Sequence, residues 1–358
     1  MKNIFKDLTS KIKEINKIAK KKKKKTVFFI GNTRKKEQNT FYLTPIRYTQ
    51  NYVYFGIVIF DDNTARKISK IVDGKFDIIF VDTEKKTFKN SKSNINKIVN
   101  TERTIKENIK RSYLRFYKAN DLTVNAAEDL IESFFKDEIR NISGKKILIF
   151  GTGNIGFKLS LRLIERGASV FLHRRNKNKL KKICDVINFI KPTGTVAKAK
   201  PILSLPKKLN LYDAIIFVAN TKNFLKISSH KIFKKKVMLL DIGKGMFDEK
   251  SLEILNKNNF LVYRLDVTPA LNTLIEETNT IKNFSKKKFL IKKKGKFIFT
   301  SSGLLGSKNS ILVDSPINPK VIFGICDGQG DFKRISRIEK KKYTKEISSL
   351  FKRRVSFL

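Results

Sequence analysis

The chain has 358 residues, 41% of them hydrophobic, which is enough to build the cores of two domains. Its longest apolar run, residues 52–60, is too short to cross a bilayer, and the N-terminus lacks the apolar core of a signal peptide. Two cysteines, Cys184 and Cys326, provide neither a disulfide framework nor metal-ligand spacing, so a soluble, cytoplasmic protein without a metal site is expected.

The formal net charge is +46, but its distribution does not point to one partner. Lysines occur in every segment, and the chain is rich in Asn, Ile and Phe without any Trp, as expected when coding DNA is AT-rich. No recognised nucleic-acid-binding signature is present. We therefore expect nonspecific binding of polyanions at low salt, with a nucleic-acid-associated protein as one alternative function.

The first 140 residues predict an arm and an α/β domain. Residues 1–25 have the composition of a basic helix that ends in a lysine run, and we expect a solvated arm there. Residues 26–140 form the expected N-terminal α/β domain, with strands at 26–31, 52–60 and 76–82 and a helix at 64–72. Residues 84–110 are polar and give no assignment. An amphipathic helix over residues 122–135, capped by Thr123, is expected to be the hinge to the next domain.

Residues 141–274 predict a Rossmann domain. A buried strand at 145–150 precedes a glycine-rich loop, a helix at 155–166, Gly167 and a second strand at 168–173. The loop has the sequence Gly151, Thr152, Gly153, Asn154, Ile155 and Gly156. This order is typical of the dinucleotide-binding βαβ unit, in which the diphosphate binds free N–H groups at the start of the helix. The alternative is that the glycines serve packing alone.

Each glycine of this loop has an expected role. Gly151 would allow the tight turn, Gly153 would let the backbone approach the diphosphate, and Gly156 would let helix and strand pack closely. Asn154 and Ile155, which open the helix, complete the predicted diphosphate site.

Further strands are predicted at 211–218, 236–240 and 261–266. Ligands of such sheets bind outside the carboxyl ends of the strands, so the following loops should face the nicotinamide and the substrate. Asn220 and Asp241 in these loops are therefore candidate cofactor-binding residues. Asp266 either contacts the ligand or caps the turn before Pro269.

The remaining residues, 275–358, predict a C-terminal extension rich in β-structure. Strands are expected around Phe297, Val313 and Ile322, and a basic helix from about residue 340 closes the chain. Glycines and acidic residues in 324–331 are interpreted as tight turns, because their spacing is not that of a calcium site.

The end of the second Rossmann strand indicates the cofactor. NAD-preferring proteins place an acidic residue there to hold the ribose 2′-OH, but residues 173–179 contain none. Arg174 and Arg175 stand there instead, and two guanidinium groups suit the 2′-phosphate of NADP. NADP is therefore expected in preference to NAD. The alternative is that a chain this basic places arginines there by chance.

Two resemblances to known families follow from these motifs. The run at 174–179 is similar to the Asn-Arg-Thr-x-x-Lys run of shikimate dehydrogenases, which are NADP enzymes. The order of α/β domain, hinge helix and Rossmann domain resembles that of shikimate and methylenetetrahydrofolate dehydrogenases. Residues 241–252 and 263–267 resemble the Arg-Gly…Asp-Glu…Leu…Leu-Asp-Val pattern of D-isomer 2-hydroxyacid dehydrogenases. The likeness covers residues 120–270 and implies an NAD(P)-binding dehydrogenase with a doubly wound parallel sheet.

The same resemblances supply candidate catalytic residues and departures from each family. Lys244 occupies the place of the 2-hydroxyacid enzymes' Arg, whereas their Glu is absent from residues 267–271. Neither histidine, His173 or His230, is placed to act as their acid. Lys118 and Asp121 are the nearest counterparts of the Lys and Asp that shikimate enzymes use, and such a pair can shuttle a proton. The alternative is a surface lysine and a helix-capping aspartate.

The sequence therefore predicts an NADP-dependent oxidoreductase. It would transfer a hydride to or from a small anionic metabolite in an interdomain cleft, with the lysines and aspartate named above as the catalytic residues. A homodimer is compatible with this prediction. A noncatalytic nucleotide-binding Rossmann protein is the first alternative, favoured by the missing His and Glu.

Overall fold

A computed structural model describes residues 2–32, 42–84, 86–89, 96–206, 208–285 and 289–358. The chain separates into two compact units, residues 1–276 and 277–358. The predicted arm, N-terminal α/β domain and Rossmann domain all belong to the first unit. The boundary expected at residue 275 falls inside a helix, α8 (Thr268–Ser285), which begins in the first unit and continues past its end.

The N-terminal α/β module is built on one mainly parallel sheet. Its strands, in spatial order, are β2 (Tyr42–Leu43), β4 (Tyr52–Ile59), β1 (Lys25–Asn32), β5 (Ile78–Asp82) and β8 (Tyr113–Tyr117), and β3 (Arg47–Tyr48) also pairs with β4. Strands β1, β4, β5 and β8 are parallel, whereas β2 and β3 run antiparallel to β4. Residues 27–30 of β1 are all buried, which explains their unbroken apolar sequence, because parallel strands are usually covered on both faces.

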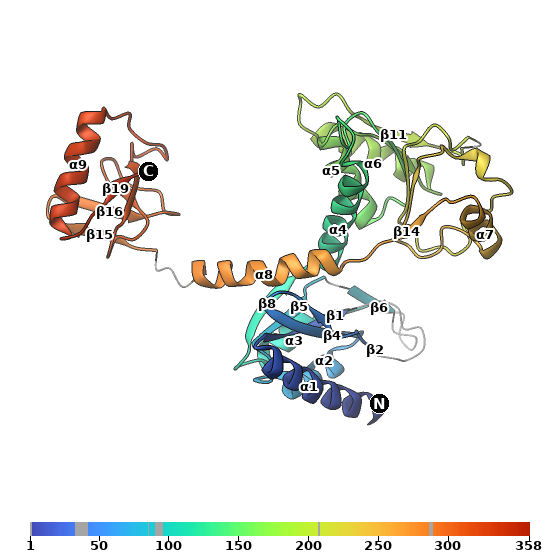
Figure 1. The fold of residues 1–358 in the computed structure, drawn as a ribbon, viewed down its shortest axis with the longest axis horizontal. Helices are drawn as coiled ribbons and strands as arrows, with labels where there is room; N and C mark the ends of the chain where they lie inside the picture. The colour runs from blue at the N-terminus through green and yellow to red at the C-terminus, as the bar shows by residue number, and fades with distance from the viewer. Residues whose placement is uncertain (1, 33–41, 85, 90–95, 207, 286–288) are drawn as a thin grey trace. The chain divides into compact units, whose positions relative to one another are not determined.

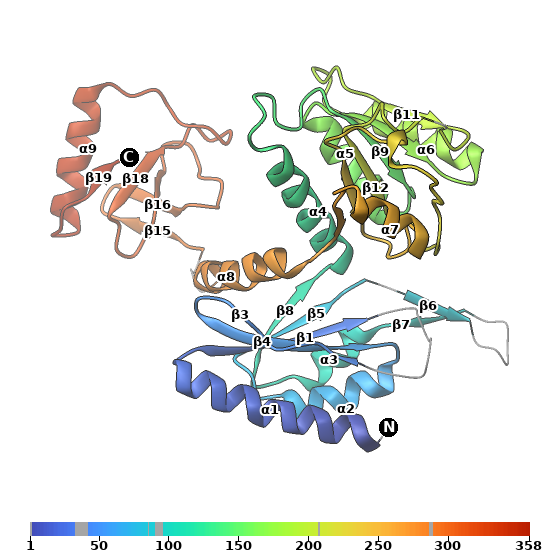
Figure 2. The ribbon, with the colours of Figure 1, turned by 45° about the vertical axis from the view of Figure 1, so that its right-hand side comes forward.

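Helices cover both faces of this sheet (Figure 1). One face packs against α1 (Lys2–Lys22), α2 (Asp62–Val72) and α3 (Thr101–Asn108). The other face packs against Leu271, Leu274 and Ile275 of α8. Figure 2 shows the same arrangement, with α1 and α2 below the sheet and α8 above it. Residues 84–110, for which the sequence gives no assignment, contain α3 and a hairpin of β6 (Lys86–Lys89) and β7 (Asn96–Val99). The edge strand β8 follows them and was not predicted either.

The expectation of a solvated N-terminal arm is corrected by the packing of α1. Leu8, Ile12, Ile15 and Ala19 recur at helical spacing, and all four are buried in the core beneath the sheet. Lysines lie between these positions, so the overall composition of the segment is basic although one face of the helix is apolar.

The helix that follows this module, α4 (Ala119–Phe135), begins three residues before its predicted start. Its N-cap is Lys118, and Thr123 is not the cap, because it lies inside the helix and its hydroxyl donates to the carbonyl of Ala119. Val124 and Ile131 on α4 pack into the core of the Rossmann domain. The helix that follows the Rossmann strands, α8, packs back on the N-terminal sheet, so two helices join the module to the domain.

The Rossmann domain has the predicted doubly wound parallel sheet. Its strands, in spatial order, are β11 (Ala199–Ile202), β10 (Ser169–His173), β9 (Lys146–Phe150), β12 (Ala214–Phe217), β13 (Met238–Asp241) and β14 (Val262–Arg264). Its helices are α5 (Asn154–Glu165), α6 (Lys177–Ile190), the short 3-10 helix η2 (His230–Ile232) and α7 (Glu249–Lys257). In order of sequence the strands lie 3-2-1-4-5-6, which is the arrangement of dinucleotide-binding sheets.

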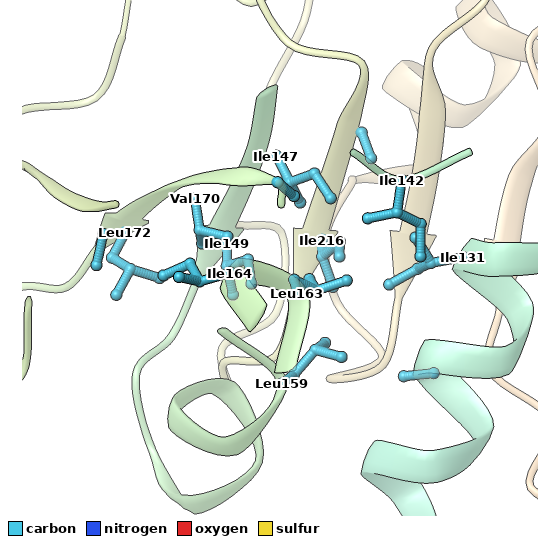
Figure 3. Packing of buried hydrophobic residues seen from close by; sticks show 14 of the residues in the cluster. Ile131, Ile142, Ile147, Ile149, Leu159, Leu163, Ile164, Val170, Leu172 and Ile216 are labelled. Carbon is cyan, nitrogen blue, oxygen red and sulfur yellow. The ribbon is translucent and has the colours of Figure 1, made fainter. Parts of the chain in front are cut away.

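Helix α5 packs on this sheet through Leu159, Leu163 and Ile164 (Figure 3). They meet Ile149 of β9 and Ile216 of β12 in one buried cluster. This contact fixes the start of α5 beside the carboxyl ends of the two central strands.

The sequence did not predict α6 or β11. Strand β11 contains Pro201, which a sheet tolerates at an edge, where one side of the strand needs no partner.

The C-terminal unit is a mixed sheet with one helix. Its strands, in spatial order, are β15 (Ile291–Lys294), β16 (Phe297–Ser301), β17 (Ile311–Val313), β18 (Val321–Ile325) and β19 (Ser356–Phe357). Helix α9 (Arg337–Leu350) begins before its predicted start, at a reciprocal cap in which Ser336 accepts from the Glu339 N–H and Glu339 accepts from the Ser336 N–H. The helix does not close the chain, because β19 follows it and pairs with β18. The β-rich extension is therefore confirmed.

A buried aspartate joins the end of α2 to the start of β8. The carboxylate of Asp73 accepts hydrogen bonds from the backbone N–H groups of Lys110, Arg111 and Ser112 at 3.1, 2.9 and 3.1 Å. Burial raises the pKa of Asp73, but these N–H groups and the Arg111 side chain outweigh burial, so the pKa lies below its ordinary value. The charged form is therefore the form that stabilises the fold.

We expect Asp73→Asn to lower the free energy of unfolding at neutral pH by about 1 kcal/mol, because the amide keeps an acceptor but loses the charge. A carboxylate with a lowered pKa stabilises the fold above about pH 4 and loses this effect as the pH falls. The difference from the wild type should therefore shrink as the pH falls below about 4 in urea unfolding measurements. Glu107→Gln, which removes an exposed partner of Arg103, should cause no measurable change. A difference in the free energy of unfolding between Asp73→Asn and the wild type that stays constant at all pH values would show that the charge of Asp73 is not what stabilises the fold.

Candidate dinucleotide site

The candidate site is a pocket of about 450 Å³ at the carboxyl ends of β9, β10 and β12. Its lining residues come from the glycine loop, the end of β10 and the loop after β12. They are Phe150, Gly151, Thr152, Gly153, His173, Arg174, Arg175, Asn176, Ala219, Asn220, Thr221 and Phe224. None of these lining residues is acidic. The pocket therefore offers positive charge and backbone groups, which suits an anionic ligand.

At two of the three glycine positions, contacts within the chain leave no room for a side chain. Gly151 has a φ of +102°, in the region that favours glycine, and a Cβ there would lie 2.7 Å from the backbone N of Ala219. A Cβ on Gly156 would lie 1.9 Å from the carbonyl oxygen of Gly151. The turn and the close approach of α5 to its own loop thus require glycine at both positions, whatever the pocket binds.

Gly153 is different, because neither its backbone conformation nor its surroundings require glycine. Its φ is −76°, which any residue adopts, and a Cβ built on it meets nothing within 4 Å. Gly153 lines the pocket and is the N-cap of α5, which has no side-chain cap hydrogen bond. The first helical hydrogen bond is donated by Phe157 to the carbonyl of Gly153, at 2.9 Å. The N–H groups of Asn154, Ile155 and Gly156 therefore precede the helical ladder and can bind an anion.

The two arginines predicted to bind a 2′-phosphate both line the pocket, in different environments. The guanidinium of Arg174, which is half-buried, donates from one nitrogen to the carbonyl and the hydroxyl of Thr152, at 3.1 and 3.3 Å. Arg175 is exposed. The next residue, Asn176, is the N-cap of α6, and its side chain accepts from the N–H of Lys179 at 2.8 Å. The end of β10 is thus held between the glycine loop and the next helix.

An aromatic wall that the sequence did not predict completes the pocket. Phe224, from the loop after β12, packs against Phe150 with ring centroids 5.1 Å apart and against His173 at 6.3 Å. His173 is held by a 2.9 Å hydrogen bond between Nδ1 and the carbonyl of Ile202. An apolar wall beside basic groups suits a purine base next to phosphates. Thr152 could have been anticipated, since it lies within the glycine motif, but no local signal identified Phe224.

The candidate residue Asp241 shapes a loop. Its carboxylate accepts from the backbone N–H groups of Lys244, Gly245 and Met246 at 2.6, 2.8 and 3.0 Å. The loop packs closely on the loop after β12, since a Cβ on Gly243 would lie 2.0 Å from the carbonyl oxygen of Ala219. Lys244 has a φ of +62° and an exposed side chain. Asp241 thus uses both carboxylate oxygens to build the loop that presents Lys244.

The predicted pair of Lys118 and Asp121 lies at the start of α4, but the structure gives Asp121 another partner. The Asp121 carboxylate forms an ion pair with Lys158 of α5, and Lys118 is the N-cap residue without a side-chain cap bond. Asp266 caps a turn, since it accepts from the Thr268 N–H at 2.9 Å and the Thr268 hydroxyl at 2.6 Å. These bonds hold the pKa of Asp266 below its ordinary value.

Two further observations concern other classes of site. Within the part of the chain that the structure describes, no helix is both long and apolar enough to cross a membrane. The same residues contain no group of three or more His, Cys, Asp and Glu side chains that could hold a metal ion.

Comparison with known proteins gives partial and distant likenesses. No family model matches the chain. The glutamyl-tRNA reductase of Thermosipho melanesiensis is 26% identical over 158 residues, which are 43% of this chain and 41% of that protein. The chain thus matches less than half of the length of that curated relative.

Solved structures that resemble the chain include named dehydrogenases. L-tryptophan dehydrogenase from Nostoc punctiforme is 13% identical with a TM-score of 0.41, over 72% of this chain and 75% of that chain. Shikimate 5-dehydrogenase from Listeria monocytogenes, in complex with shikimate and NAD, is 11% identical with a TM-score of 0.40, over 73% and 96%. Both likenesses are distant, with TM-scores below 0.5.

Proposed function

We propose that this protein is an NADP-dependent oxidoreductase that transfers a hydride to or from a carbon atom of a small anionic metabolite. The observation that carries the proposal is Gly153, where the chain gains nothing from glycine by packing, beside an uncapped helix start. Space for a diphosphate explains both features, because the diphosphate would take the place of a Cβ and accept from the free N–H groups. The reductase name of the curated relative supports the redox chemistry.

The choice of NADP rests on the charge of the pocket. No acidic residue among the described pocket residues is available to accept from a ribose 2′-OH, and the exposed guanidinium of Arg175 lines the pocket. A 2′-phosphate offers such a group several charged oxygen acceptors, whereas a 2′-OH offers one neutral acceptor. The nicotinamide would supply the hydride chemistry, and the protein would supply orientation and charge.

Substrate binding is proposed at the carboxyl ends of the Rossmann strands, in a cleft toward the N-terminal module. Lys244 is our candidate for holding an anionic group, because its loop is fixed by Asp241 and its side chain is exposed. Lys118 would donate or accept the proton at the reacting oxygen or nitrogen. The Asp121 carboxylate would act there only after leaving Lys158. The two cysteines are free and buried, which fits work in the reducing cytoplasm.

A noncatalytic nucleotide-binding protein is the second candidate. It is favoured by the engagement of Asp241 with its loop and of Asp121 with Lys158, which occupies two of the expected functional carboxylates. Such a protein would bind the dinucleotide through the same pocket but would show no turnover.

The proposal is tested by titrating the full chain with NADPH and with NADH at physiological salt, following nicotinamide fluorescence. The chain contains no Trp, so protein emission interferes little. Saturable and NADPH-selective binding is expected, and absence of binding for both cofactors would exclude the dinucleotide site. A screen of small carbonyl acids with NADPH then separates an enzyme from a binding protein. Strong loss of affinity with rising salt would instead favour general polyanion binding.

The exposed arginine offers a sharp test of cofactor choice. We expect Arg175→Ala to weaken NADPH binding by about 2 kcal/mol while leaving NADH binding nearly unchanged, because only NADPH carries the 2′-phosphate. Arg140→Ala, which removes an exposed arginine that does not line the pocket, is the matched control for the loss of one charge. Equal losses for both cofactors in Arg175→Ala would contradict the assignment.

A further inference from the structure

The two arginines at the end of β10 differ in a way that separates their functions. The guanidinium of Arg174 already donates to the carbonyl and the hydroxyl of Thr152, at 3.1 and 3.3 Å, in the middle of the glycine loop. Thr152 is only 3% exposed, so these acceptors lie against the protein. Arg175 is exposed at the wall of the same pocket.

We propose that Arg174 is a positioning residue for the diphosphate loop, required equally by NADPH and NADH, and that Arg175 alone distinguishes the two cofactors. The inference rests on the proposed dinucleotide site and assigns different roles to two residues that the sequence treats as a pair.

The physical basis is the geometry of the peptide bond between Thr152 and Gly153. The peptide is planar and trans, so its carbonyl and its N–H point in opposite directions. A donor that holds the Thr152 carbonyl therefore also fixes the direction of the Gly153 N–H. This matters because Gly153 has no side chain to restrict the peptide, and helix α5 has no side-chain cap to hold the loop. A guanidinium anchored on Thr152 supplies that restriction from the neighbouring strand.

The strand itself is well fixed, so it can serve as the anchor. His173 is held to the carbonyl of Ile202, and the N–H of Gly151 donates to the carbonyl of His173 at 3.0 Å. On the other side of the arginines, Asn176 caps α6. Arg174 thus projects from a rigid segment onto a glycine-rich one, and the diphosphate that this loop would bind is common to both cofactors.

The test compares the wild-type chain with Arg174→Met, Arg174→Lys and Arg175→Ala by titration with NADPH and with NADH. Methionine keeps much of the side chain's apolar stem but has no donor, so Arg174→Met should weaken both cofactors by the same factor, about tenfold. One nitrogen of Arg174 makes both contacts, so the single ammonium of Arg174→Lys should restore both affinities. Arg175→Ala should weaken NADPH alone. Thermal melting of each variant confirms that the loss is not caused by unfolding.

Each outcome bears on one proposal at a time. Loss of NADPH binding alone in Arg174→Met would show that Arg174 contacts the 2′-phosphate, which overturns the inference and leaves the proposed function intact. Equal losses that lysine does not restore would also overturn it, because the hydrogen bonds to Thr152 would then not be the cause. Failure of the wild-type chain to bind either cofactor would instead reject the proposed function.

Discussion

Gly153→Val is expected to abolish the binding of NADPH and NADH while leaving the protein folded. A Cβ at this position meets nothing within 4 Å, and the φ of −76° suits valine, so the substitution costs the fold little. The branched side chain would occupy the space beside the N–H groups at the start of α5, where the diphosphate is proposed to bind. We expect affinity to fall by more than about 100-fold, because a diphosphate kept from these donors loses several charge-assisted hydrogen bonds.

The measurement is the fluorescence titration described above, paired with a thermal melt. Gly194→Val is the matched control, because a Cβ on Gly194 also meets nothing within 4 Å and this glycine does not line the pocket. The control should bind both cofactors as the wild type does. Unchanged NADPH affinity in Gly153→Val would show that the cofactor does not bind at this loop, which would contradict the proposed function.

Gly156→Ala should have the opposite profile, with its main effect on stability. The added Cβ would lie 1.9 Å from the carbonyl oxygen of Gly151, and this neighbour is backbone in a tight turn that cannot easily move. Either α5 shifts away from the sheet or the loop distorts, and we expect the free energy of unfolding to fall by about 3 kcal/mol. Urea unfolding followed by circular dichroism measures this loss.

Gly153→Ala is the natural comparison, since it adds the same methyl group three residues earlier in open space. Its stability should stay close to that of the wild type, with a small change from its effect as a helix cap. Equal stability for Gly156→Ala and the wild type would show that α5 does not approach its loop as closely as the structure places it.

The local pattern was enough to predict the Rossmann domain. Buried apolar runs at 147–150 and 214–217, with a glycine loop and an amphipathic helix between strands, admit few other folds. Strand β11 escaped prediction because Lys200 and Pro201 break its apolar pattern, which only an edge position tolerates. Helix α1 was placed correctly, but its buried face was missed because the sheet it covers forms from later parts of the chain.

The sequence by itself determined the first βαβ unit of the Rossmann domain, the glycine turn and the basic end of β10, because each depends on residues that are neighbours in the chain. Only the tertiary structure decided which of these groups are already engaged. Asp121 forms an ion pair with Lys158 of another helix, and Arg174, which follows β10, donates to Thr152 in the loop after β9. Such partners lie far apart in sequence and meet only when the sheet has formed, so their roles follow from the packing of the fold rather than from any local motif.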